Sequence, residues 1–171
     1  PSGCGGILGR FPNGTLTAMA SDAMSSSTAL PPAEILGPLN EVELKHAPRQ
    51  LYCAGKLALL RLGPRVSVVG SRRASAEGLR RAAALSRALV QHQMTVVSGL
   101  AEGIDTAAHL SAIEAGGNTI AVIGSPLDVS YPKVNEALQA RLAREQLVVS
   151  QFEPGRPVLP GNFPIRDRTM A

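Results

Sequence analysis

The chain has 171 residues and 44% of them are hydrophobic, which suits one ordinary domain with a buried core and leaves little room for a second. Lysine and arginine, mostly arginine, number 17 against 13 acidic residues, and this net charge of +4 favours an anionic partner. The two cysteines lack disulfide or metal-ligand spacing, and we find no signal peptide and no apolar run of membrane-spanning length. We therefore expect a cytoplasmic protein without a metal centre or membrane contact.

The first 38 residues differ in composition from the rest of the chain. Residues 1–38 are rich in Gly, Ser, Thr, Ala and Pro and contain only three charged residues. This composition predicts an irregular or flexible leader. We expect the folded domain to occupy residues 39–171.

Four short runs rich in β-branched residues alternate with three helical stretches in this domain. The pattern predicts an α/β fold with right-handed crossovers, in which a parallel sheet lies between helices on both faces in a three-layer arrangement. Ser75 and Asp105 are the expected N-caps of the first two helices. Ligands of such sheets bind outside the carboxyl ends of the strands, so the strand exits are the candidate sites. The expected strands are 66–70, 95–99, 119–124 and 147–152, and the expected helices are 75–93, 105–117 and 131–146.

The first strand exit reads GSRRAS. Gly70 permits a sharp turn, and Ser71, Ser75 and the side chains of Arg72 and Arg73 are placed to meet a phosphate near a helix N-terminus. A solvated basic turn is an equally good interpretation of these residues. The stretch does not match the G-x-G-x-x-G fingerprint, so we expect no nicotinamide cofactor.

The second exit, SGLAEGID, has Gly99 and Gly103 ahead of a helix. Both glycines are candidates for a phosphate-binding turn. Asp105 and His109 are four residues apart, a spacing that suits an acid/base or metal-binding pair. An N-cap aspartate followed by a packed, hydrogen-bonded histidine is the commoner arrangement and is our preferred interpretation.

The third exit, GSPLDVSYPK, supplies Gly124, Ser125 and Lys133. A lysine in the first helical turn opposes the helix dipole and is better tolerated beside an anion, although it also fits an ordinary surface residue. After the last strand comes a Pro/Gly-rich loop that ends in Arg166 and Arg168. We predict that these cations complete a basic pocket with those of the other exits.

Five ordered motifs in this chain resemble the DNA processing protein A family, DprA, also called Smf. They are preceded by APRQLYCAGKLALL, which is similar to that family's lead-in to its first strand, so the resemblance covers about residues 40–171. The motifs are VVGSRRAS, VVSGLAEGIDTAAH, G-x-TIAVIG, LDVSYPK-x-N and FPIRDRTMA.

The resemblance implies a Rossmann-like, non-catalytic domain without a cofactor. It also implies that the domain binds single-stranded DNA, forms a homodimer and helps to load the RecA recombinase during transformation. The family's strand-exit arginine falls on Arg72, its basic residue after Tyr-Pro on Lys133, and its F-P-x-R-N-R segment on residues 163–168. Asp167 stands where the family usually has asparagine. The family's pattern continues with a further strand, so we expect an incomplete domain with an exposed sheet edge.

Two alternatives stay open. The first is a nucleotide-binding or nucleotide-sensing module of the same fold, with one phosphorylated small molecule held by the glycine turns. The second is an enzyme similar to the LOG phosphoribohydrolases, which carry P-G-G-x-G-T-x-x-E after a later strand. The PSGCGG stretch at residues 1–6 precedes every expected strand and lacks the glutamate, which disfavours the enzyme.

Overall fold

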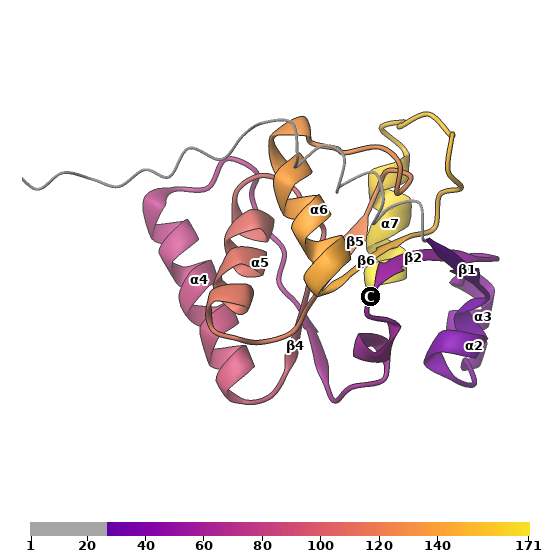
Figure 1. Ribbon diagram of the computed structural model, residues 1–171, viewed down its shortest axis with the longest axis horizontal. Coiled ribbons are helices and arrows are strands. Elements are labelled where there is room, and N and C mark those ends of the chain that lie inside the picture. Colours follow the sequence, from indigo (N-terminus) through magenta and orange to yellow (C-terminus); the bar gives the residue numbers. More distant parts are fainter. Residues whose placement is uncertain (1–26) are drawn as a thin grey trace, which may run out of the picture.

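The computed structural model describes residues 27–171, in which one six-stranded sheet carries helices on both faces (Figure 1). The leader expected over residues 1–38 lies mostly outside the described residues, as does PSGCGG. The strand order across the sheet is β1-β2-β6-β5-β4-β3. The strands are β1 (Thr28–Leu30), β2 (Leu51–Gly55), β3 (Arg65–Ser67), β4 (Thr95–Ser98), β5 (Thr119–Ile123) and β6 (Leu147–Ser150).

The four strands β3 to β6 are parallel, as predicted, and they follow one another in sequence order across the sheet. They are joined by α4 (Ala76–Gln91), α5 (Ile104–Glu114) and α6 (Glu136–Glu145), with the short 3-10 helix η2 (Lys133–Asn135) before α6. Right-handed crossovers between successive neighbours place all three connecting helices on the same face of a sheet. In Figure 1 these helices stand side by side, with α4 on the left and α6 nearest the centre.

The other end of the sheet is antiparallel, which the sequence analysis did not predict. Strand β2 pairs antiparallel with β6, and β1 pairs antiparallel with β2. The sheet is therefore mixed, and regular structure begins at Thr28, eleven residues before the expected start of the domain at residue 39. The short helices of this region are α2 (Pro32–Leu36), α3 (Glu41–His46) and the 3-10 helix η1 (Leu57–Leu60).

The alternation of side chains along the strands divides the core into two layers. In β5, Ala121 and Ile123 pack toward α5 and α6, whereas Ile120 and Val122 belong to a second cluster with Leu59 of η1 on the opposite face. Both layers are apolar because the strands are buried on both sides, as expected for the parallel part of such a sheet.

The second face is covered in part by α7 (Asn162–Met170), a helix in the segment expected to be a Pro/Gly-rich loop. Beside it lies a groove of about 410 Å³, with Val97, Ile120 and Val149 among the residues of its floor and Arg168 among those of its wall. No helix within residues 27–171 is both long and apolar enough to cross a membrane.

Candidate functional site

The carboxyl ends of the parallel strands surround a small hollow of about 60 Å³. Four segments that are distant in the sequence contribute to it: the loops after β3, β4 and β5, and helix α7. This is the edge of the sheet at which we predicted a site. The residues around the hollow are Arg72, Gly99, Ala101, Glu102, Tyr131, Pro132, Phe163 and Arg166.

Arg72 is held above an aromatic ring at the mouth of this hollow. Its guanidinium carbon lies 5.3 Å from the centroid of the Phe163 ring, within range of a cation–π interaction. Tyr131 lies beside the same ring, with 5.3 Å between the two centroids and 40° between the ring planes. Arg72 is exposed, and no ion pair with it is found within residues 27–171. The arrangement orients a cation whose N–H donors face solvent.

The sequence analysis did not predict this aromatic pair. Tyr131 and Phe163 are two of the five aromatic residues in the chain, and Tyr131 is 42% exposed. Each precedes a proline, but they are separated by 32 positions, so only the tertiary fold brings them together. A flat exposed ring beside a cation is suited to stacking with a nucleic-acid base.

The loop after β3 uses its hydroxyl groups to fix its own backbone. Ser71 Oγ accepts a hydrogen bond from Arg73 N at 3.1 Å, and Ser75 Oγ accepts one from Gly78 N at 3.1 Å. Ser75 is thus the N-cap of α4, as predicted. The side chains of Arg72 and Arg73 are exposed. They are the groups of this loop best placed to meet an anion.

The glycines of the exits allow parts of the protein to approach one another closely. A Cβ on Gly70 would lie 2.9 Å from Ile104 Cβ, and Gly103, with φ of +79°, lies against the backbone carbonyl of Ser71. A Cβ on Gly124 would lie 2.6 Å from the Phe163 ring, and one on Gly99 would collide with the Arg166 guanidinium. The space above these glycines is filled by protein groups, and a direct contact between them and a phosphate stays a prediction.

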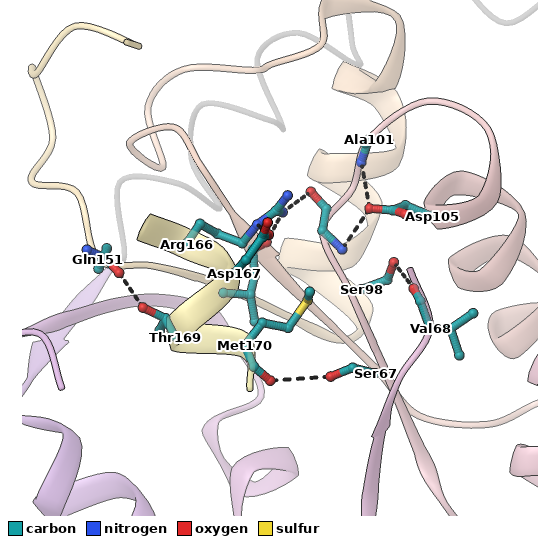
Figure 2. A network of polar contacts seen from close by, with 12 residues as sticks. Ser67, Val68, Ser98, Ala101, Asp105, Gln151, Arg166, Asp167, Thr169 and Met170 are labelled. Carbon is teal, nitrogen blue, oxygen red and sulfur yellow. Dashed lines mark hydrogen bonds and ion pairs between the residues drawn. The ribbon is translucent and has the colours of Figure 1, made fainter. Parts of the chain in front are cut away.

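Arg166 is the buried member of the predicted basic pocket, with only 6% of its surface exposed. Its Nη1 donates to the carbonyl oxygens of Gly99 at 2.6 Å and Val122 at 2.7 Å, and its Nε donates to Asp167 Oδ1 at 2.8 Å. Figure 2 shows the guanidinium reaching from α7 toward the end of β4. Arg166 fastens α7 to β5 and to the residue that follows β4, and Asp167 pairs with it.

The remaining predicted cations lie in different places. Lys133 is exposed, and its Nζ lies 2.6 Å from Glu136 Oε1, so a carboxylate supports it in the first turn of the helix. Arg168 lines the groove on the second face of the sheet and is not among the residues around the hollow. The five predicted cations therefore do not form a single pocket.

Ser125 is buried behind the third exit. Its hydroxyl donates to the carbonyl oxygen of Val129 at 3.0 Å, and its own carbonyl oxygen accepts from Ser150 Oγ at 2.7 Å. These bonds hold the loop after β5 against the end of β6. A contact between Ser125 and a ligand stays a prediction.

Asp105 is not the N-cap of α5, which begins after Gly103. Its buried carboxylate instead accepts hydrogen bonds from the backbone N–H groups of Gly99 at 3.1 Å and Ala101 at 3.4 Å (Figure 2). Burial raises the pKa of this carboxyl, whereas these hydrogen bonds and the charge of Arg166 oppose the shift. Asp105 thus shapes the loop that borders the hollow.

His109 is a packed histidine, as we preferred. It is fully buried, and its Nδ1 lies 2.7 Å from Thr119 Oγ1. Because the Thr119 hydroxyl donates to the carbonyl oxygen of Val96, Nδ1 carries the proton and donates to Thr119. Burial, with a smaller contribution from the charge of Arg166, lowers the pKa of His109 to about 3. Within residues 27–171 no group of three or more His, Cys, Asp or Glu side chains is arranged to hold a metal ion.

Comparison with known proteins gives concordant matches. The sequence model of the family described as DNA recombination-mediator protein A matches residues 32–171. DNA processing protein DprA of Streptococcus pneumoniae is 46% identical over 129 residues, which are 75% of this chain and 45% of the relative. Protein Smf of Escherichia coli is 36% identical, over 72% of this chain and 33% of the relative. The chain thus spans less than half the length of these relatives.

Two solved structures share the fold. DNA processing protein A of Streptococcus pneumoniae superposes with a TM-score of 0.78 at 40% identity, over 90% of this chain and 54% of the other. The protein of the same name from Helicobacter pylori, described for its single-stranded DNA binding mode, gives a TM-score of 0.71 at 28% identity, over 85% of this chain and 64% of the other.

Proposed function

Because this chain belongs to the DNA recombination-mediator protein A family, we propose that it binds single-stranded DNA at the carboxyl ends of its parallel strands. The observation that carries this proposal is the exposed Arg72 held over Phe163 beside the exposed Tyr131. A cation for the phosphate and a ring for the base are the two elements of binding to single strands without sequence preference. The single-stranded DNA binding of the Helicobacter pylori relative supports the same ligand.

In this mechanism Arg72 donates to phosphate oxygens, while Tyr131 stacks against a base. The cation–π contact limits the conformations of the Arg72 side chain, so less conformational entropy is lost when a phosphate binds. Lys133, two residues after Tyr131, supplies a second positive charge. Its ion pair with Glu136 is exposed and contributes little stability, so a phosphate can replace the carboxylate. No reacting group is required, and the proposed role is non-catalytic.

For the whole protein we propose a cytoplasmic recombination mediator that acts as a homodimer and assists the loading of RecA onto the bound strand. The names of the relatives, which describe DNA processing, support this assignment. The pairing into dimers and the contact with RecA follow from the family resemblance.

The proposal is tested by fluorescence anisotropy of a labelled oligo-dT at about 50 mM and about 200 mM salt. The logarithm of the affinity falls linearly with the logarithm of the salt concentration, and each lost phosphate contact makes this slope shallower by about 0.7. At 0.1 M salt this corresponds to an affinity about fivefold weaker. We expect such losses for Arg72→Ala and Lys133→Ala. Arg144→Ala, on the last turn of α6, is the matched control and should retain the affinity. Absence of binding by the unaltered protein at low salt would overturn the proposal.

The volume of the hollow argues against the alternative of a small-nucleotide site. Small-molecule sites usually enclose about 300–1,000 Å³, and this hollow has about 60 Å³. It can receive a single group such as a phosphate, while the rest of the ligand lies on the surface. A thermal shift with free nucleotides in the absence of DNA binding would favour the alternative.

A further inference from the structure

Helix α4 carries a row of exposed residues that begins close to the candidate site. The helix starts one residue after Ser75, so its first turn adjoins the loop that bears Arg72. It is the outermost of the three helices on its face of the sheet (Figure 1). Its inner side packs through Ala82 and Ser86, which are buried. The outer row, which we call the α4 stripe, consists of Arg80, Ala84, Arg87 and Gln91.

The geometry of an α-helix places these four residues on one side, because they follow one another at intervals of four, three and four positions. At 1.5 Å per residue, the distance along the axis from Ala76 to Arg87 is about 17 Å. A stacked single strand advances about 3.4 Å per nucleotide, so this distance corresponds to about five nucleotides. Ala84, between the two arginines, leaves space for a backbone to approach the helix.

The charge of this surface is strongly positive. Four exposed arginines, at positions 73, 80, 81 and 87, lie in or next to α4, and Glu77 is the acidic residue among them. Glu77 accepts from Arg80 at 2.5 Å and from Arg81 at 2.8 Å, and these hydrogen bonds lower the pKa of its carboxyl. No ion pair of Arg87 is found within residues 27–171. Exposed ion pairs such as those of Glu77 contribute little stability, so phosphates can replace the carboxylate.

We propose that the α4 stripe binds the phosphate backbone of single-stranded DNA where the strand leaves the hollow. This inference rests on the proposed function and extends it from one nucleotide position to a path. The ligand is a backbone because the exposed side of α4 offers guanidinium groups and no aromatic ring on which a base could stack. It is a single strand because the stripe continues from the loop of Arg72, where the proposed function places a single strand.

The test compares two lengths of labelled oligo-dT, about 5 and about 20 nucleotides, with the full-length protein. The short strand occupies only the hollow and its surroundings, whereas the long strand also reaches the α4 stripe. We expect Arg87→Ala to weaken binding of the long strand about fivefold at 0.1 M salt and to lower its salt slope by about 0.7, with the short strand unchanged. Glu77→Gln should tighten binding of the long strand, since it removes the carboxylate that competes with phosphate.

Two variants at the end of α6 are controls that change the charge of the protein in the same way as Arg87→Ala and Glu77→Gln. Arg144→Ala and Glu145→Gln repeat the same changes of charge on an exposed helical ion pair, and neither should alter binding. An unchanged affinity of Arg87→Ala for the long strand, or an equal loss for both lengths, would overturn the path along α4. Retention of binding in Arg72→Ala would overturn the proposed function itself, so the two failures are distinguishable.

Discussion

Two groups of charged residues lie at the same edge of the sheet and differ in what satisfies them. In the outer group, Arg72 and Lys133 are exposed and are held by a ring face and by one surface carboxylate. In the inner group, Arg166 and Asp105 are buried and bind backbone groups of the strand exits. The comparison teaches that positive charge at a strand exit does not by itself identify a ligand site. Such a site is identified by the N–H donors that stay exposed to solvent.

Arg166→Ala is the change that should affect the inner group most. It leaves the buried carbonyl oxygens of Gly99 and Val122 without a donor and removes the main anchor of α7. A buried unsatisfied group costs about 1–3 kcal/mol, so we expect a loss of about 3–5 kcal/mol in the free energy of unfolding by urea. Arg168→Ala, on the exposed side of the same helix, is the control and should change it by less than about 0.5 kcal/mol. Equal effects of the two variants would refute the distinction.

His109, which is buried near Arg166 of the inner group, should make the stability of the fold sensitive to acid. Its pKa is lowered from 6.5 to about 3 by burial, so below pH 6.5 the unfolded chain binds a proton that the folded chain does not. The free energy of unfolding therefore falls with falling pH by up to about 1.4 kcal/mol per pH unit, which is about 2 kcal/mol at pH 5. Urea unfolding of His109→Gln at several pH values supplies the reference, because contributions of Asp105 are common to both proteins. A difference between the two proteins that does not change between pH 7 and pH 5 would contradict this assignment.

Gly124→Ala should affect both stability and DNA binding, because Gly124 lies against the Phe163 ring that holds Arg72. A methyl group there would lie 2.6 Å from Phe163 Cδ1, so the ring must move. We expect a loss of about 1–2 kcal/mol in stability from this overpacking, together with weaker binding of oligo-dT. Gly161→Ala is the control, because Gly161 has φ of −67° and a Cβ there meets nothing within 4 Å. Unchanged DNA affinity in a folded Gly124→Ala protein would show that the position of the ring is unimportant.

The parallel half of the sheet could be predicted because its strands are dense in β-branched residues and its first helix begins after a clear cap, Ser75. Strand β2 was missed because LYCAG contains no β-branched residue, and its antiparallel direction depends on pairing with β6. Helix α7 was missed because a Pro/Gly-rich segment precedes it and Pro164 lies in its first turn, where proline is tolerated.

The hollow lies at the edge of the sheet where the sequence predicted a site, and only some of the residues around it were predicted. Arg72 stood out because it lies between an expected strand and the cap of the next helix, Ser75. The roles of Phe163 and Arg166 could not be predicted, since they depend on contacts with Gly124 and Gly99 that are distant in the sequence. A glycine at a strand exit has the same signature in sequence whether a phosphate or a side chain occupies the space above it.

Replacing arginine by lysine in each group compares the two groups directly. It should have only a small effect on DNA affinity in the outer group and a larger effect on stability in the inner group. Arg72→Lys keeps the charge but loses the planar guanidinium over Phe163, so we expect the affinity for oligo-dT to fall by only about 0.5–1 kcal/mol, with unfolding unchanged. Arg166→Lys also keeps the charge, but an ammonium cannot reproduce the fork that serves Gly99, Val122 and Asp167, so stability should fall. If Arg72→Lys destabilised the fold as much as Arg166→Lys, Arg72 would belong to the structural group, and the exposed cations left for a phosphate at this edge would be Arg73 and Lys133.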